Sequence, residues 1–258
     1  MKNNLFAVVA VSFLVLAGCA EKNLENDSRA VSESETAVFA ELNELQRERR
    51  DAFYNSISLE SNKALTDEAG SIMKLAQRTP EKSITYSESR TKNMVERLKA
   101  AADYHIIYAD DDVKMETAVK DKKMKISICT EQSASMMIFN GNTVNCYSPI
   151  DASGYKITLS NEDMESYSGE TLLDSTIYYP KNDSEVVSVS TVHSEGEVYT
   201  CEVFDGFAYL FDSDGSMRMF CDSSNNFTAS IETDNISDNI FDLPDGYVVE
   251  DHDNNPVK

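Results

Sequence analysis

The spacing of hydrophobic residues divides the chain into four parts. Leu5 to Ala17 is an apolar run with one polar interruption, and residues 20–35 are polar with almost no large apolar side chain. From Thr36 onward, apolar residues recur three and four positions apart, which is the period of a helix with one buried face. Beyond Ala102 this period is lost, and short apolar segments are separated by turn residues, which indicates β-strands.

The helical pattern predicts three helices, over residues 36–57, 64–77 and 91–102. On the first helix a single stripe is formed by Val38, Leu42, Leu45, Arg49 and Phe53. We therefore expect a helical segment over residues 36–82, which follows a flexible tether over residues 19–35.

The remaining pattern predicts many short strands joined by tight turns. The turn signals, which suit backbone with positive φ, are Asn140-Gly141, Glu195-Gly196, Asp205-Gly206 and Asp214-Gly215. The expected strands cover residues 105–108, 122–130, 136–139, 143–147, 175–179, 186–193, 198–204, 207–211, 216–221 and 227–232. Consecutive antiparallel strands behind a helical segment predict an α+β fold. We expect a curved antiparallel β-sheet, a half-barrel with the N-terminal helices packed on it, over residues 84–251, and a polar tail over residues 252–258.

The best-patterned strands allow a register to be predicted. A two-residue turn at Asp205-Gly206 places Phe204 opposite Phe207, and a four-residue turn over residues 212–215 then places Tyr209 opposite Arg218. In this register both sheet faces are mainly apolar, so each must be covered. One face carries Tyr199, Cys201, Val203, Ala208, Leu210, Met217, Met219 and Cys221. The other carries an aromatic group that is the candidate lining of a ligand cavity: Phe204, Phe207, Tyr209, Phe211 and Phe220.

The N-terminus has the three parts of a bacterial lipoprotein signal. Lys2 supplies a positive charge, and the apolar run of 13 residues is too short to span a bilayer. The run ends in Leu16-Ala17-Gly18-Cys19, which resembles the bacterial lipobox. The resemblance implies a signal peptide over residues 1–18, lipid on the Cys19 thiol, and cleavage that makes Cys19 the first residue. It also implies a chain anchored to the cell membrane or outer membrane and facing outside the cytoplasm.

A second resemblance covers roughly Lys92 to Glu250. Three segments carry it: Met94–His105, the hairpin Met137–Tyr147, and Asn239–Tyr247 with its ending Phe-x-Leu-Pro-x-x-Tyr. These segments resemble the lipoprotein-carrier-like (LolA/LolB-like) half-barrel superfamily. The resemblance implies a curved sheet around helices, with an apolar cavity that holds acyl chains in some members. It brings no family-wide catalytic residue.

Two functional hypotheses follow from these patterns. In the first, an envelope lipoprotein binds an acyl chain or another hydrophobic ligand in its half-barrel. In the second, the helices fill the barrel and the protein has a non-catalytic structural or interaction role at the cell surface. We do not expect an enzyme.

Charge and motif content narrow the possible functions. The net charge is −22 over 258 residues, and residues 1–18 carry only the charge of Lys2, so the chain from Cys19 onward has a net charge of −23. This charge argues against nucleic-acid binding and against broad contact with anionic lipid headgroups. The three histidines, His105, His193 and His252, stand in no metal or nucleophile motif, and there is no phosphate-binding or dinucleotide-binding glycine motif. We therefore expect no catalytic residue, metal or cofactor.

The cysteines leave two alternatives. Beyond Cys19 there are four, Cys129, Cys146, Cys201 and Cys221, an even number that permits two disulfides in an exported protein. Buried thiols are the alternative. In the predicted register, Cys201 and Cys221 lie two strands apart, about 9–10 Å, too far for a direct disulfide unless the sheet bends strongly.

Two further segments need an explanation. The lysines of residues 120–125 form a basic island in an acidic chain. They either keep a strand edge soluble or contact a lipid headgroup or a protein partner. Near the C-terminus, the large apolar side chains Phe241, Leu243 and Tyr247 come shortly before the polar end over residues 250–258, so we expect residues 241–247 to close the fold.

Overall fold

The structure is a computed structural model that describes residues 33–59, 61–165, 167–194, 196–223, 225–243 and 247–251. The expected signal peptide, Cys19, the tether up to residue 32 and the tail 252–258 lie outside these residues.

The sheet dominates the described fold, and the helices are few. The helices are α2 (Glu33–Ser56), α3 (Lys63–Arg78), α4 (Arg90–Ala100), α5 (Asn161–Glu165) and α6 (Gly169–Thr176), with 3-10 turns η1 (Tyr86–Glu88) and η2 (Asp238–Phe241). The strands are β1 (Lys82–Thr85), β2 (Tyr104–Ala109), β3 (Lys114–Lys120), β4 (Lys123–Cys129), β5 (Ala134–Asn140), β6 (Thr143–Ser148), β7 (Ser153–Thr158), β8 (Val186–Ser194), β9 (Glu197–Val203), β10 (Phe207–Phe211), β11 (Met217–Asp222), β12 (Asn226–Glu232) and β13 (Val248–Asp251).

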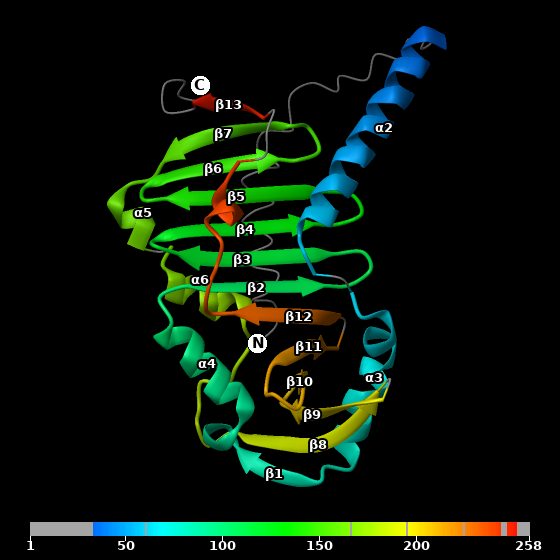
Figure 1. The fold of residues 1–258 in the computed structure, drawn as a ribbon, viewed down its shortest axis with the longest axis vertical. Coiled ribbons are helices and arrows are strands. Elements are labelled where there is room, and N and C mark those ends of the chain that lie inside the picture. The colour runs from blue at the N-terminus through cyan, green and yellow to red at the C-terminus, as the bar shows by residue number, and fades with distance from the viewer. Residues whose placement is uncertain are drawn as a thin grey trace.

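All thirteen strands belong to one sheet, in the order β1-β8-β9-β10-β11-β12-β2-β3-β4-β5-β6-β7-β13 (Figure 1). It consists of two meanders, β2 to β7 and β8 to β12, which meet where β12 pairs with β2. The two end strands differ, because β1 pairs antiparallel with β8 while β13 pairs parallel with β7.

The prediction of a half-barrel with N-terminal helices packed on it is wrong. The chain forms a large, mostly antiparallel open sheet on which the helices cover only parts of the faces. The two meanders extend in opposite directions from the β12–β2 pairing, so β1 and β13 end up at opposite ends of the sheet. Strand periodicity predicts the hairpins but carries no information on whether the first and last strands approach each other.

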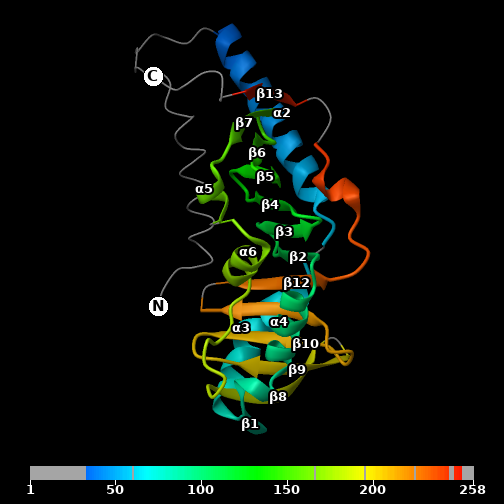
Figure 2. The same ribbon diagram turned by 90° about the vertical axis from the view of Figure 1, so that its left-hand side faces the viewer.

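Each face of the sheet is covered by different segments. Beside β2 to β7, the α2 helix and the segment that follows β12 lie on one face, and α5 and α6 lie on the other (Figure 2). Beside the second meander, α3 packs on one face through Leu65, Ala69, Ile72 and Ala76. The α4 and α6 helices pack on the opposite face, in the largest core cluster. Both faces of the second meander are therefore covered, as its apolar pattern required.

The start of α4 is fixed by an acidic side chain from the sheet. The Glu202 carboxylate on β9 accepts hydrogen bonds from the backbone N–H of Arg90 at 2.7 Å and of Thr91 at 3.0 Å, and from the Thr91 hydroxyl at 2.7 Å. Ser89 caps the same helix by accepting from Lys92 N at 2.9 Å. A carboxylate at a helix N-terminus satisfies orphan N–H groups and suits the helix dipole, so the almost fully buried Glu202 holds the first turn of α4 on the sheet.

The register of the second meander is partly as predicted. Asp205-Gly206 forms the expected two-residue turn, with Gly206 at φ +92°, and Phe204 N donates to Phe207 O at 2.8 Å. The next turn is longer than expected, and a bulge between Leu210 and Phe211 shifts the pairing. Tyr209 therefore lies opposite Phe220, not opposite Arg218.

The bulge changes the face of one residue only. The longer turn and the bulge together move the partners of Tyr209 and Leu210 by two residues along β11 relative to the predicted register. A shift of two residues leaves each side chain on the same face of the sheet. Met217 is the exception, since it pairs with Phe211 and joins the aromatic face. The predicted turn at Asn140-Gly141 is also displaced by one residue, because Asn140 pairs with Thr143 and the turn is Gly141-Asn142.

Candidate functional site

The five residues predicted to line a ligand cavity form one aromatic cluster on adjacent strands. Phe204 and Phe207 stack with ring centroids 4.7 Å apart. Tyr209 contacts Phe220 and Phe211 at centroid distances of 5.4 and 6.3 Å. The fold therefore brings together the aromatic residues that the strand pattern placed on one face.

The cluster is packed against helices and loops. Phe204 meets Tyr86 of η1 edge-on at 6.2 Å, and its core cluster includes Met94, Val95 and Leu98 of α4 and Leu172 and Leu173 of α6. Tyr178, in the segment after α6, stacks on Phe220 at 5.9 Å. Four of the five rings are buried, and Phe207 is half-buried. These rings act as core for the sheet and its covering helices.

Tyr209 also fixes the segment that covers the cluster. Its hydroxyl accepts from Tyr178 N at 3.0 Å and donates to Tyr178 O at 2.9 Å. Burial raises the pKa of Tyr209 well above its ordinary value, so the hydroxyl stays protonated and can donate. One side chain thus satisfies both backbone groups of a loop residue inside the core.

The four cysteines of the sheet are buried thiols, and none forms a disulfide in the described chain. Cys201 and Cys221 lie on the face under α3. Cys129 and Cys146 lie in the clusters around the first meander. Burial raises the pKa of Cys129 to about 11 and that of Cys201 to about 12, and it raises the pKa of Cys221 further. Thiols with such pKa values are weak nucleophiles at neutral pH.

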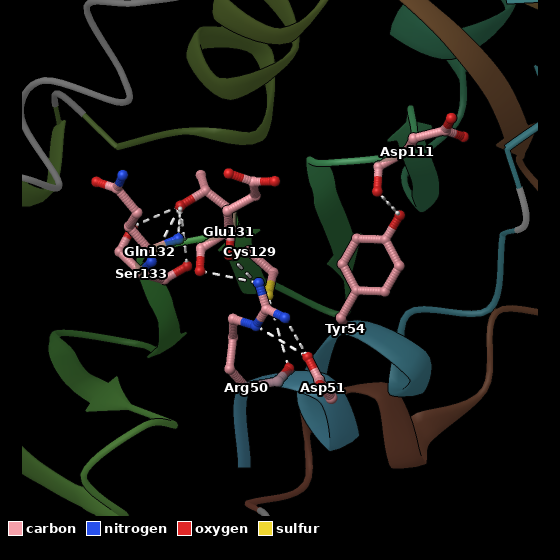
Figure 3. Close-up of polar contacts among 9 residues, drawn as sticks. Arg50, Asp51, Tyr54, Asp111, Cys129, Glu131, Gln132 and Ser133 are labelled. Carbon is pink, nitrogen blue, oxygen red and sulfur yellow. Dashed lines mark hydrogen bonds and ion pairs between the residues drawn. The ribbon is translucent and has the colours of Figure 1, made fainter. Parts of the chain in front are cut away.

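The C-terminal half of α2 is joined to the sheet by polar contacts (Figure 3). The Arg50 Nη1 atom donates to Glu131 O at 2.8 Å, and Arg50 also pairs with Asp51. The Cys129 thiol lies 3.8 Å from Arg50 O, and the Tyr54 hydroxyl donates to Asp110 O at 2.7 Å. These contacts attach α2 to the β2–β3 and β4–β5 turns.

Apolar packing and a buried lysine complete this junction. Phe53 and Ile57 are buried against the first meander, in the cluster that also holds Phe241. Lys114 Nζ donates to Ile57 O at 2.8 Å and lies 4.3 Å from the centre of the Tyr54 ring. The end of α2 is therefore held rigidly, whereas Leu42 and Leu45 nearer its start are exposed.

A buried acid–base group lies on the same sheet face and was missed by the sequence analysis. The Glu116 carboxylate is 2.9 Å from His105 Nε2 and 2.7 Å from Lys125 Nζ, and these residues come from β3, β2 and β4. Burial alone would raise the pKa of Glu116, but the His105 hydrogen bond and the Lys125 charge outweigh burial and lower it. The sequence does contain a signal for this group. Charged residues stand at alternate positions in β3 and β4, as Lys114 and Glu116 and as Lys123 and Lys125.

Two predicted segments near the C-terminus are placed by the structure. Lys120 of the basic island bonds to Ile236 O at 2.7 Å and to Asp238 at 2.9 Å, so it fastens the segment after β12. Phe241 is buried, and the Tyr247 ring packs edge-on against Tyr147 at 5.7 Å, as expected for a closing segment. Leu243 is exposed, against expectation, and residues 244–246 lie outside the described residues.

The part of the chain that the structure describes holds neither a candidate metal site nor a candidate membrane span. There, no group of three or more His, Cys, Asp or Glu side chains is arranged to hold a metal ion. No helix among the same residues is long and apolar enough to cross a membrane. The lipidation candidate, Cys19, lies outside them.

Comparisons with known proteins do not assign a family. No family model matches the chain, and no curated protein matches it. A solved structure of PNGF-II is similar over 58% of this chain and 32% of that chain, with 9% sequence identity and a TM-score of 0.20. This chain thus spans about a third of the length of that structure. A likeness of this size carries no argument about fold or function.

Proposed function

We propose that the protein is a lipid-anchored lipoprotein of a bacterial cell envelope that presents a non-catalytic, sheet-based body to a protein partner. The observation that carries the proposal is the box Leu16-Ala17-Gly18-Cys19 directly after an apolar run of signal-peptide length. Lipid on Cys19 would hold the chain at the membrane with no spanning helix.

The geometry of α2 suits a spacer between anchor and body. The helix begins at Glu33, 14 residues after Cys19, and its 24 residues extend about 36 Å. Its C-terminal half is fixed to the sheet by Arg50, Tyr54 and Phe53, and its first turns project past the β13 end of the sheet (Figure 1). A rigid helix with this attachment would hold the sheet away from the lipid.

The packing of the aromatic cluster supports an interaction role over acyl-chain binding. A hydrophobic ligand needs apolar side chains that face an unfilled space. Tyr209 and Phe211 are fully buried, and the cluster packs on residues of α4 and α6. We therefore favour the hypothesis in which protein side chains occupy the space predicted for a ligand.

Metabolic labelling with radioactive palmitate tests the anchor. The Cys19→Ser variant should lose label, remain as unprocessed precursor and leave the membrane fraction. Cys129→Ser is the matched control, since it removes a buried thiol of the sheet, and it should be labelled as the wild type is. Normal labelling of Cys19→Ser would refute the lipid anchor.

Ligand binding and partner contact are tested separately. Native mass spectrometry of the protein extracted from its bacterial host should show the lipid-modified mass alone, and a fluorescent fatty acid should not bind. A co-purified acyl ligand would instead establish the cavity hypothesis. Photo-crosslinking groups placed over the exposed surface in cells should give a discrete protein adduct, and its absence at every position would refute the interaction role.

A further inference from the structure

The outer edge of β13 differs from the rest of the sheet. The strand pairs with β7 on one side, and among the described residues no strand pairs with its other side. Val248 N donates to Ala152 O at 3.2 Å, on the β7 side. Because backbone groups alternate sides along a strand, the N–H and C=O of Val249 point outward. An edge of this kind can accept an added strand.

The opposite end of the sheet provides a comparison within the same chain. The β1 edge carries Lys82, which is exposed, and Pro80 shortly before the strand. Lysine and proline are the residues with which natural sheets block edge pairing. The described part of β13 carries neither, and Val248 is 68% exposed, the highest value among the large apolar residues there.

Two further exposed apolar side chains lie on α2, which contacts the turn where β13 begins. Leu42 and Leu45 lie on the half of α2 that is not packed on the sheet. The helix touches the β6–β7 turn through Gln46, which bonds to Asp151 at 3.2 Å, and β13 begins at the same turn through Ala152. The exposed leucines of α2 and the exposed valines of β13 thus lie on two elements that contact the same turn.

The charge of this region indicates the kind of partner. Glu250 and Asp251 end the strand, Glu44 is exposed on α2, and Asp151 lies in the shared turn. Lys156 is the basic residue opposite Asp251 on β7. In antiparallel pairing with a second copy of β13, the register that places Glu250 opposite Glu250 of the second copy sets like charges face to face, which is unfavourable.

We propose that the outer edge of β13 docks an extended, basic segment of another protein, which adds to the sheet as a further strand. Its backbone would bond to Val249, its apolar side chains would rest on Val248 and on Leu42 and Leu45, and its lysines or arginines would meet the acidic end of β13. The net charge of −22 would favour the approach of such a segment. The inference rests on the proposed interaction role, and it requires no lipid on Cys19.

A short peptide of alternating valine and lysine tests the inference on the full chain in non-ionic detergent. It should bind saturably and slow hydrogen exchange at the Val249 amide. A peptide with glutamate in place of lysine should not bind. N-methylation of the peptide backbone positions that face β13 should weaken binding by about tenfold or more, because each methyl group removes a hydrogen bond to the strand. Equal binding of the lysine and glutamate peptides would overturn the proposal.

Variants at the two edges locate the contact. Val249→Pro removes an outward N–H without removing the Val248 bond to β7, and it should abolish binding. Ser83→Pro does the same at β1, where alternation from the Tyr86 N bond to Glu185 O places the Ser83 N–H outward, and it should bind as the wild type does. Val249→Lys, which keeps a strand-compatible backbone, should also weaken binding by charge. Unchanged binding in Val249→Lys and Val249→Pro would refute the site.

Two further outcomes separate this inference from the interaction role itself. Crosslinks in cells at Leu45 or Val249 agree with the β13 site, whereas crosslinks found only over other strands would refute it and leave the interaction role intact. Sedimentation that shows a dimer lost in Val249→Pro would identify the occupant as a second copy, and would likewise overturn the proposal.

Discussion

His105 Nε2 lies 2.9 Å from the Glu116 carboxylate, inside the sheet and beside the pairing of β2 with β12. Glu232 of β12 is directly opposite His105 in the register, with its carboxylate 3.9 Å from His105 Nδ1. Lys125 completes the group from β4. The buried Glu116 carboxylate thus links three neighbouring strands, β2, β3 and β4. These strands lie next to the β12–β2 pairing, which joins the two described meanders.

The substitution Glu116→Gln should destabilise the protein by about 3–5 kcal/mol at pH 7, because it leaves the largely buried Lys125 ammonium without its counter-charge. The pKa of Glu116 is lower in the folded chain than its ordinary value. Its contribution is therefore complete above the unfolded pKa of about 4.3 and is lost as the pH falls below it. Urea unfolding at pH 7 and below pH 4 should show the gap between variant and wild type narrowing in acid.

Glu232→Gln is the matched control for this measurement. The Glu232 side chain is 59% exposed and lies farther from His105, so its replacement should change stability by less than about 1 kcal/mol. If Glu116→Gln unfolds like Glu232→Gln at pH 7, the buried group contributes little to holding the strands together.

The same buried charges explain why one central strand escaped prediction. Residues 114–120 read Lys-Met-Glu-Thr-Ala-Val-Lys, which has no alternation of apolar and polar positions, yet they form β3. Lys114 and Glu116 are both buried, because each finds a partner from another element. A prediction that assumes every charged residue to be exposed cannot detect such a strand. The helices α3 and α4, which have ordinary apolar stripes, were predicted close to their observed bounds.

Other errors came from information that lies outside local sequence. Residues 175–179 were predicted as a strand, but Gly169–Thr176 is α6, whose buried Leu172 and Leu173 pack on the large core cluster. The strand β7 was missed because it holds Gly154, where a side chain would meet the Tyr147 ring at 2.6 Å. The aromatic cluster was found because it depends on hairpin register alone, whereas the role of its rings depends on which helices cover them.

The thiols provide a test of both the cysteine alternatives and the anchor. All four sheet cysteines are buried, and burial raises the pKa of Cys129, Cys201 and Cys221. A thiol reagent should therefore react very slowly with the native protein. In denaturant without reductant, four of the five cysteines should react if Cys19 carries lipid. Five reacting thiols would contradict lipidation, and two or none would contradict the absence of disulfides.

Phe241→Ala should cost about 3–5 kcal/mol through lost burial and the cavity left behind. The ring is buried in the cluster with Phe53 and Ile107, where the segment after β12 crosses the first meander. Leu243→Ala, two residues on and exposed, should change stability by less than about 0.5 kcal/mol. Chemical denaturation of both variants gives the comparison, and similar midpoints would show that the crossing segment adds little to the fold.

Two buried tyrosines allow the worth of a single hydroxyl to be measured. The Tyr209 hydroxyl both accepts from and donates to the backbone of Tyr178, so Tyr209→Phe removes both of these bonds and should cost about 1–3 kcal/mol. The Tyr86 hydroxyl is buried with no hydrogen-bond partner among the described residues, so Tyr86→Phe should be neutral or slightly stabilising. Both substitutions keep the ring and its packing, so urea unfolding isolates the hydroxyl. Hydrogen exchange at the Tyr178 amide should rise in Tyr209→Phe and stay unchanged in Tyr86→Phe, and equal stability of the two variants would mean that the covering loop is held by ring packing alone.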